Sequence, residues 1–180
     1  MDQLTFEDVY KTCFAFVFRN AKRLGVGDAS IDDVVQEVFL VVHRRLHDYD
    51  GRVPINGWIF GILSHVVRGH RRTLRRKYRP MVQSELDAEA TRDVISSAVE
   101  PLRIIEQREA ARLLLGLLDS LDDDKRELLV LSELEQLTVP EIAEAMGTNV
   151  NTVYSRVKAA KKAFAEVYAR ETARAARRSR

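Results

Sequence analysis

Side chains suited to reading DNA gather in one short segment of the C-terminal half. Amide, hydroxyl and basic groups lie close together there, at Asn149, Asn151, Thr152, Tyr154, Ser155, Arg156 and Lys158. Asn and Arg can make paired hydrogen bonds to base edges in the major groove. Hydroxyl groups and Lys can bind phosphates and set the register of the protein on the duplex. The chemistry expected of this segment is recognition of double-stranded DNA.

The residues around this segment predict the element that positions it. Thr138 and Glu141 have the spacing of a capping box, and Pro140 fits the first turn of a helix. Gly147 permits the positive φ that ends a helix and turns the chain. A second helix follows, and its buried side is formed by Val150, Val153 and Val157. The pattern predicts a helix-turn-helix over residues 138–163, with its second helix entering the major groove.

Charge is strongly segregated along the chain, although the net charge is only +2. Residues 51–84 contain no acidic side chain, and most of their positive charge falls after Val67. Among the charged residues of 119–144, only Lys125 and Arg126 are basic and the others are acidic. The chain becomes basic again after Asn151. Two basic blocks separated by acidic sequence predict two separate contacts with a polyanion.

Apolar residues at three- and four-residue spacing predict helices throughout the N-terminal half. The first helix covers about residues 6–24 and ends at Gly25 and Gly27. Ser30 and Asp33 resemble a capping box that opens a second helix, which runs to about His47. This second helix has more apolar residues than one core-facing stripe needs, so part of it is expected to meet another domain or protein. A third helix, about residues 58–79, is apolar first and basic afterwards.

The expected fold class is all-α, with two small helical bundles joined by a flexible linker. The 180 residues include only 8 Gly and 4 Pro, which favours helices. Periodicity weakens between the two bundles, where Ser, Glu, Asp and Ala dominate. We therefore expect domains at 1–80 and 102–168, a linker at 81–101 and a basic tail at 169–180. The tail could contact DNA non-specifically or be a frayed, solvated end, and we favour the second interpretation.

Composition excludes several other classes. Cys13 is the only cysteine, so an intrachain disulfide or a cysteine-built zinc site is excluded. The four histidines lack acidic or cysteine partners at ligand spacing, and we expect neither a metal nor a cofactor. No apolar run approaches the roughly 18 residues of a membrane span. The start of the sequence lacks the order of a signal peptide, and we expect a cytoplasmic location without membrane insertion.

Two segments together resemble bacterial RNA polymerase sigma factors of the extracytoplasmic-function (ECF) type. Residues 32–40 (DDVVQEVFL), followed by residues 58–62 (WIFGI) and the basic run, resemble sigma region 2. The helix-turn-helix with residues 151–157 (NTVYSRV) resembles sigma region 4. The order and spacing of the segments also match. The resemblance covers about residues 5–80 and 102–168.

The resemblance implies docking on core RNA polymerase. In such factors the equivalent of the second helix binds the clamp helices of the β′ subunit, and region 4 contacts the β flap. Here the clamp-binding residues would be Asp33, Gln36, Glu37 and Leu40. The alternative for these positions is a helix-capping carboxylate followed by a solvated polar stripe.

The resemblance also implies that the first domain recognises and melts the promoter −10 element, while region 4 reads the −35 element. The implied −10 residues are Arg52, Asn56, Ser64, His65, Arg68, Arg71 and Arg72. Such residues could neutralise phosphates and hold an extruded base. Trp58 could stack on a base, but we favour a place in the core. Many relatives have Arg-Asn at Ser64-His65 and Asp at Gly69, so the preferred promoter sequence stays open.

We therefore expect a sigma factor that binds core polymerase, directs it to promoters and helps melt the −10 region. An anti-sigma factor is expected as a partner, because the family commonly uses one. A stand-alone helix-turn-helix regulator is the alternative, but it leaves residues 33–40 without a role and predicts a dimer on a two-fold site. An enzyme, such as a nuclease using Asp122, Asp123 and Asp124, is disfavoured. Three consecutive carboxylates point in different directions and more simply stabilise a helix start.

Overall fold

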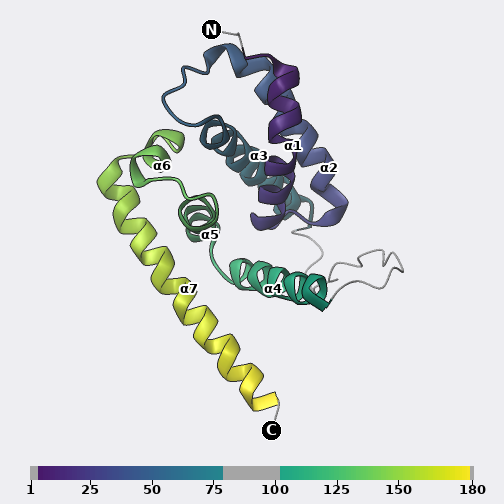
Figure 1. Ribbon diagram of the computed structural model, residues 1–180, viewed down its shortest axis with the longest axis vertical. Coiled ribbons are helices and arrows are strands. Elements are labelled where there is room, and N and C mark those ends of the chain that lie inside the picture. The colour runs from purple at the N-terminus through teal and green to yellow at the C-terminus, as the bar shows by residue number, and fades with distance from the viewer. Residues whose placement is uncertain (1–3, 79–101, 179–180) are drawn as a thin grey trace.

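The computed structural model describes residues 4–78 and 102–178, with side chains for 4–74 and 107–177 (Figure 1). The N-terminal half contains α1 (Phe6–Arg23), α2 (Asp28–Arg45), a 3-10 turn η1 (Leu46–Asp48) and α3 (Ile55–Tyr78). The C-terminal half contains α4 (Leu102–Asp119), α5 (Asp123–Leu129), a π-helical turn η2 (Val130–Leu134), α6 (Val139–Ala145) and α7 (Val150–Arg178). No strand occurs in these described ranges, and the all-α prediction is confirmed. The predicted linker at 81–101 lies outside them.

Helices α1, α2 and α3 pack around a shared apolar core, with Val17, Val38, Ile59 and Leu63 fully buried. Thr5 caps α1 by accepting a hydrogen bond from the backbone N–H of Asp8. The chain then turns at Gly25, whose φ is +79°. The predicted capping box at Ser30 and Asp33 is wrong, because α2 begins at Asp28 with Gly27 at the N-cap.

Helix α3 begins at Ile55, about one turn earlier than predicted. Asn56, expected in the preceding loop, therefore lies in the first turn of the helix. Trp58 is half-buried against the core, and its ring centroid lies 5.4 Å from that of Tyr49. This contact agrees with the structural role that we favoured for Trp58.

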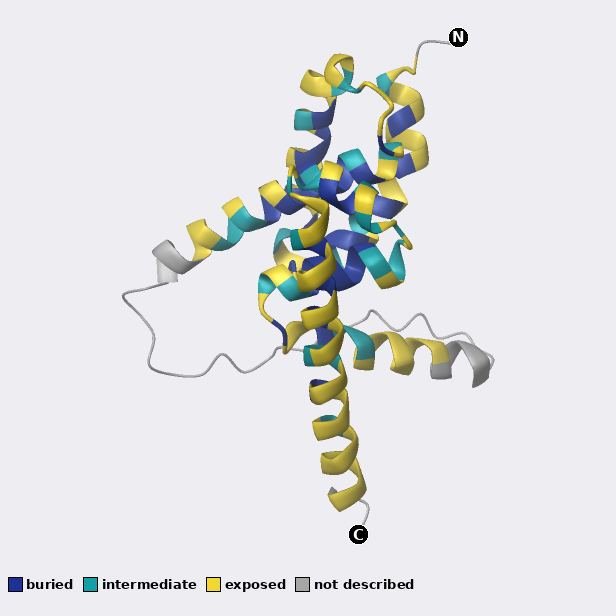
Figure 2. Ribbon diagram, turned by 90° about the vertical axis from the view of Figure 1, so that its left-hand side faces the viewer, coloured by how far each residue is buried: buried dark blue, intermediate teal, exposed yellow. Residues whose placement is uncertain are grey.

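The predicted helix-turn-helix is present as α6 and α7. Thr138 and Glu141 form the expected capping box, and Gly147 has a φ of +58° at the turn. Val153 and Val157 are buried and hold α7 against the rest of the half, but Val150, predicted to be buried with them, is 46% exposed at the start of the helix. Helix α7 then continues to Arg178, so the tail is helical where a frayed end was predicted, whereas the prediction that it is solvated agrees with the structure. Beyond Val167, the described side chains are largely exposed (Figure 2).

The two helical halves are in direct contact. Helix α5 lies between α3 and α7, and α6 packs on α3 (Figure 1). Arg126, only 5% exposed, donates hydrogen bonds to the carbonyls of Leu24, Leu118 and Leu121. Arg23 on α1 forms an ion pair with Glu135, which follows η2. The buried side chains of both halves consequently form one continuous core.

Among the described helices, none combines the length and the apolar character that a membrane crossing requires.

Candidate polymerase and DNA interfaces

The residues predicted to bind polymerase share one face of α2. Asp33, Gln36, Glu37 and Leu40 are separated by three and four positions, which places them along one side of a helix. All four are exposed, and Leu40 is 55% exposed although it is apolar. We call these four residues the docking stripe. Its mixture of polar groups and a bare leucine suits a protein partner.

An aromatic groove borders the docking stripe, and sequence reasoning did not identify it. The groove has a volume of about 570 Å³ and lies between α1 and α2. It is lined mainly by rings and by residues of α2, including Phe6, Tyr10, Phe14, Phe39, Leu40 and His43. The ring of Tyr10 packs edge-to-face with that of Phe39, and the two ring centroids lie 4.7 Å apart. Tyr10 and Phe14 nevertheless remain exposed. Tyr10 and Phe14 each follow a buried position by one residue, so they lie on a different side of α1 from Val9, Cys13 and Val17. This spacing was the sequence signal that could have predicted the groove.

The helix-turn-helix presents its predicted DNA-binding side chains at the start of α7. Six of them are exposed, namely Asn149, Asn151, Tyr154, Ser155, Arg156 and Lys158, and Thr152 is half-buried. The side chain of Asn149 accepts a hydrogen bond from the backbone N–H of Asn151 at 2.9 Å. Asn149 therefore also supports the helix start, while Tyr154, 67% exposed, projects into solvent.

The capping box fixes α6, on which the recognition helix rests. Glu141 accepts hydrogen bonds from the backbone N–H and the hydroxyl of Thr138, both at 2.7 Å. These hydrogen bonds lower the pKa of Glu141 below its usual value. The capping carboxylate consequently stays ionised, which favours the N-terminal end of the helix.

The residues predicted for the −10 element fall into two groups. The first group, Arg52, Asn56, His65 and Arg72, is exposed. Arg52 forms ion pairs with Asp50 at 3.0 Å in the loop before α3 and with Glu144 of α6 at 3.9 Å. The side-chain oxygen of Asn56 accepts a hydrogen bond from the thiol of Cys13 at 3.6 Å. These four side chains lie before α3 or on its first three-quarters and can be reached from solvent.

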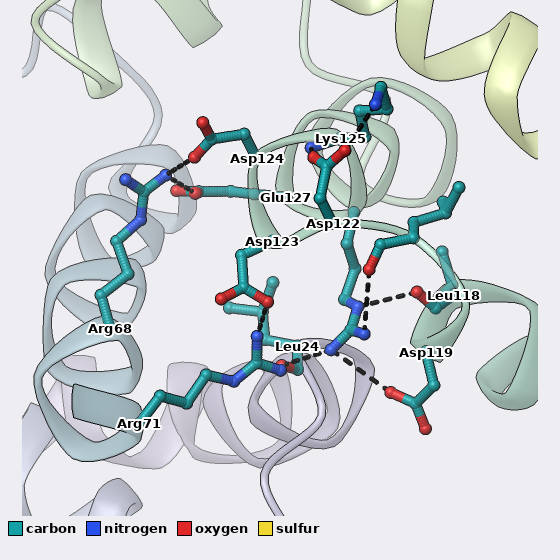
Figure 3. Close-up of polar contacts among 12 residues, drawn as sticks. Leu24, Arg68, Arg71, Leu118, Asp119, Asp122, Asp123, Asp124, Lys125 and Glu127 are labelled. Carbon is teal, nitrogen blue, oxygen red and sulfur yellow. Dashed lines mark hydrogen bonds and ion pairs between the residues drawn. The ribbon is translucent and has the colours of Figure 1, made fainter. Parts of the chain in front are cut away.

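The second group is engaged by the C-terminal half (Figure 3). Arg68 forms ion pairs with Asp124 at 2.9 Å and with Glu127. Arg71 forms an ion pair with Asp123 and donates to the carbonyl of Leu24. The hydrogen bond from Arg68 to Glu127 is the main cause that raises the pKa of Arg68 above its ordinary value. Ser64, one turn earlier, is only 8% exposed.

The acidic turn of α5 has a role that the sequence did not reveal. Asp122 caps the helix as interpreted, accepting from the backbone N–H of Lys125 at 2.9 Å. Asp123 and Asp124, in the first turn, also reach across to α3. A cavity of about 290 Å³ lies between the halves, with Ser64 and His65 of α3 on one side and Arg156 of α7 on the other. Residues predicted for two different promoter elements therefore face one pocket.

In the ranges 4–74 and 107–177, no three or more His, Cys, Asp or Glu side chains gather closely enough to hold a metal ion.

The helical fold contains a helix-turn-helix with a polar, basic second helix. It also contains a second basic helix and the exposed docking stripe. These features define a helical protein of the DNA-binding class. Comparison with family models gives sigma-70 region 2 over residues 9–77 and sigma-70 region 4 over residues 111–164. Both matches fall inside the ranges that the resemblance covered. The chain belongs to the ECF RNA polymerase sigma factors of the sigma-70 family.

Individual relatives agree with this assignment. The chain is 31% identical over 142 residues to the RNA polymerase sigma factor CnrH of Cupriavidus metallidurans, covering 76% of this chain and 72% of the relative. It is 29% identical over 161 residues to the RNA polymerase sigma factor NccH of Alcaligenes xylosoxydans xylosoxydans, covering 89% and 84%. It is 27% identical over 144 residues to the ECF RNA polymerase sigma-E factor of Escherichia coli, covering 77% and 74%.

Solved structures support the fold. CnrH in complex with the cytosolic domain of CnrY matches with a TM-score of 0.62 at 22% identity, over 91% of this chain and 86% of that one. The sigma factor RpoE in complex with the anti-sigma factor NepR from Bartonella quintana matches with a TM-score of 0.68 at 17% identity, over 91% and 96%. The two family models and the sequence relatives together show that the chain is a sigma factor, a protein that directs RNA polymerase to promoters. A stand-alone regulator therefore no longer explains its N-terminal half.

Proposed function

We propose that this sigma factor docks on core RNA polymerase through α2, reads the −35 element with α7 and recognises and melts the −10 element with α3. The observation that carries this proposal is the docking stripe, an exposed polar and apolar face on the same chain as a helix-turn-helix. A DNA-binding protein that works alone has no need for such a face. The domains would then be residues 1–80 and 102–168, working in the cytoplasm.

The docking stripe would meet the clamp helices of the polymerase β′ subunit. Leu40 would bury its exposed side chain in the partner, and the aromatic groove beside it would add apolar area. Asp33, Gln36 and Glu37 would supply hydrogen bonds and charge around this apolar centre, the arrangement common in protein interfaces. The C-terminal half would contact the β flap.

The DNA contacts would divide between α7 and α3. Asn151 and Arg156 are exposed near the start of α7 and can read base edges, while Tyr154 and Lys158 can bind phosphates. On α3 and the loop before it, Arg52 and Arg72 would neutralise phosphates, and Asn56 would face an extruded base. Catalysis would remain with the polymerase, since no step here requires chemistry by the sigma factor itself.

Control by an anti-sigma factor is part of this proposal. It is supported by the structural neighbour RpoE, which was solved with such a partner. The exposed docking stripe and the exposed start of α7 are the surfaces that a partner would have to cover in order to block both polymerase and DNA.

Run-off transcription with core polymerase and a genomic promoter library tests the proposal. The double variant Gln36→Ala/Glu37→Ala should lose core binding, whereas Arg156→Ala should lose selectivity at the −35 element and keep core binding. Lys162→Ala is the matched control for Arg156→Ala, because Lys162 is an exposed cation further along the same helix. Tight, site-specific DNA binding by the free chain without promoter-specific initiation would disprove the proposal.

A further inference from the structure

The acidic start of α5 lies against the basic second half of α3, and the two surfaces neutralise each other. We infer that Asp123, Asp124 and Glu127 form a latch on Arg68 and Arg71, which withholds these two arginines from DNA until α5 and α6 separate from α3. The inference rests on the proposed function, because it takes Arg68 and Arg71 to be part of the −10 surface. It goes beyond that function by naming an internal competitor for the DNA.

The electrostatic half of the latch is more than a surface ion pair. Glu127 is only 4% exposed, so its carboxylate depends on Arg68 for compensation. Removing a partner from a buried pair is strongly unfavourable, whereas pairs in full contact with solvent contribute little. Arg71 is held twice, by Asp123 and by the carbonyl of Leu24. Figure 3 shows the guanidinium group of Arg68 turned toward Asp124 and Glu127 of α5, and that of Arg71 turned toward Asp123 and Leu24.

The steric half of the latch is a close approach between α3 and α6. A Cβ atom placed on Gly61 would lie 2.8 Å from the carbonyl oxygen of Ala145, too close for any side chain without movement of the backbone. Ser64 is buried one turn further along α3. Gly69 gives the opposite result, because no described heavy atom lies within 4 Å of a Cβ placed there. Gly61 therefore permits this contact, and Gly69 takes no part in it.

Carboxylates and phosphates compete for the same guanidinium groups. Both anions accept hydrogen bonds from the N–H groups of arginine. Arg68 uses Nη2 for both Asp124 and Glu127, and Arg71 uses Nη1 for Asp123 and Nη2 for the carbonyl of Leu24. In the closed arrangement Arg68 and Arg71 are already paired with carboxylates of α5, and α6 packs on α3. The apparent affinity of α3 for DNA in the free chain therefore equals the affinity of the open form multiplied by the fraction of molecules that are open.

Binding of a fluorescent oligo-dT to the free, full-length chain tests the latch, together with the radius of gyration from small-angle X-ray scattering. Two variants open the latch by different means. Gly61→Leu wedges α3 from α6. Its control is Gly116→Leu on α4, because a Cβ atom placed on Gly116 also meets no described heavy atom within 4 Å and Gly116 lies outside the proposed DNA surface. Asp123→Asn/Asp124→Asn removes carboxylates, with Glu109→Gln/Glu166→Gln as a control of equal charge change on exposed positions of α4 and α7.

Both latch variants should have a larger radius of gyration and bind oligo-dT about tenfold more tightly, because the apparent dissociation constant scales inversely with the open fraction. Both controls should match the wild type. Adding Arg68→Ala/Arg71→Ala to the charge variant should abolish its gain, which general loosening of the fold would not do. Circular dichroism checks that Gly61→Leu stays helical. If this variant loses its helical structure, the test rests on Asp123→Asn/Asp124→Asn alone.

Two results would overturn the latch. One is wild-type size and DNA affinity in the charge variant. The other is an opened chain whose DNA affinity does not rise, because α5 would then withhold nothing. Neither result bears on promoter-directed transcription with core polymerase, so failure of the latch is distinguishable from failure of the proposed function.

Discussion

Arg126 carries its charge inside the protein and joins the end of α4 and the turn before α5 to the distant residue Leu24, which follows α1. Its guanidinium donates to the carbonyl of Leu118 at 2.8 Å in α4, of Leu24 at 3.0 Å after α1, and of Leu121 at 3.4 Å. Burial lowers the pKa of Arg126, and the nearby carboxylate of Asp119, at 3.2 Å, partly offsets that effect. The side chain therefore links the two halves of the protein through hydrogen bonds inside an apolar core.

Replacing Arg126 with Met should destabilise the fold by about 3 kcal/mol, because buried carbonyl groups would lose their donors. Urea unfolding measures this loss. Lys125→Met is the matched control, since Lys125 is a cation whose ammonium bonds to Asp122 at the surface, and its removal should cost about 1 kcal/mol or less. Similar losses in the two variants would contradict the structural role of Arg126.

Glu141 gives the helix-turn-helix a dependence on pH. Because the folded pKa of Glu141 lies below its unfolded value, its contribution is complete above the unfolded pKa and is lost as pH falls through the folded one. The stability difference between wild type and Glu141→Gln, measured by urea unfolding, should therefore be largest near about pH 7 and shrink below about pH 4. A difference that stays constant over this range would contradict the capping role of the charge.

At the scale of the elements, local sequence rules predicted what local interactions decide. The capping box at Thr138, the turn at Gly147 and the exposed face of α2 depend on residues within a few positions of one another. The start of α2 was misplaced because the turn at Gly25 to Gly27 sets it, and Ser30 merely resembled a cap. The end of α7 was misjudged because its Ala and Arg residues favour a helix even without a core to pack on.

The pairing of α5 with α3 could not have been predicted in this way. Arg68 and Asp124 are 56 residues apart, and their own neighbours in sequence give each a sufficient local role. Asp124 suits the first turn of a helix, and Arg68 suits a basic face. Only the packing of the two halves brings them together, and that depends on the close approach at Gly61 as well as on charge.

Truncation of α7 after Ala169 should change neither stability nor recognition of the −35 element. None of the removed residues whose side chains are described is buried. The removed segment begins roughly 30 Å along the helix from its DNA-reading end. Thermal unfolding and binding to −35 DNA in the holoenzyme measure the two effects. Val167→Ala, which removes buried methyl groups from the same helix, should instead cost about 1–3 kcal/mol. A truncation that weakened −35 binding would show that the basic tail contacts DNA.

At the scale of the whole molecule, one chain has to serve two arrangements. In the closed arrangement the halves share a core, and the arginines of α3 are neutralised by α5. In the promoter-bound arrangement the same arginines would face phosphates, while α7 lies on a separate DNA element. The interface between the halves must therefore be strong enough to form and weak enough to be replaced. Ion pairs that phosphate can displace, together with a contact that depends on one glycine, meet both requirements.

Core polymerase should remove the difference between the wild type and the latch variants. Once α2 is docked and the halves are held apart, opening no longer limits DNA binding, so Gly61→Leu holoenzyme and wild-type holoenzyme should bind a promoter fragment with equal affinity. The free chains should still differ by about tenfold, since only there does the closed population lower the apparent affinity. Titration of one labelled promoter with each free chain and each holoenzyme measures both ratios. A tenfold gain that persisted in the holoenzyme would mean that the leucine adds a DNA contact of its own, and the gain would then owe nothing to the separation of α3 from α6.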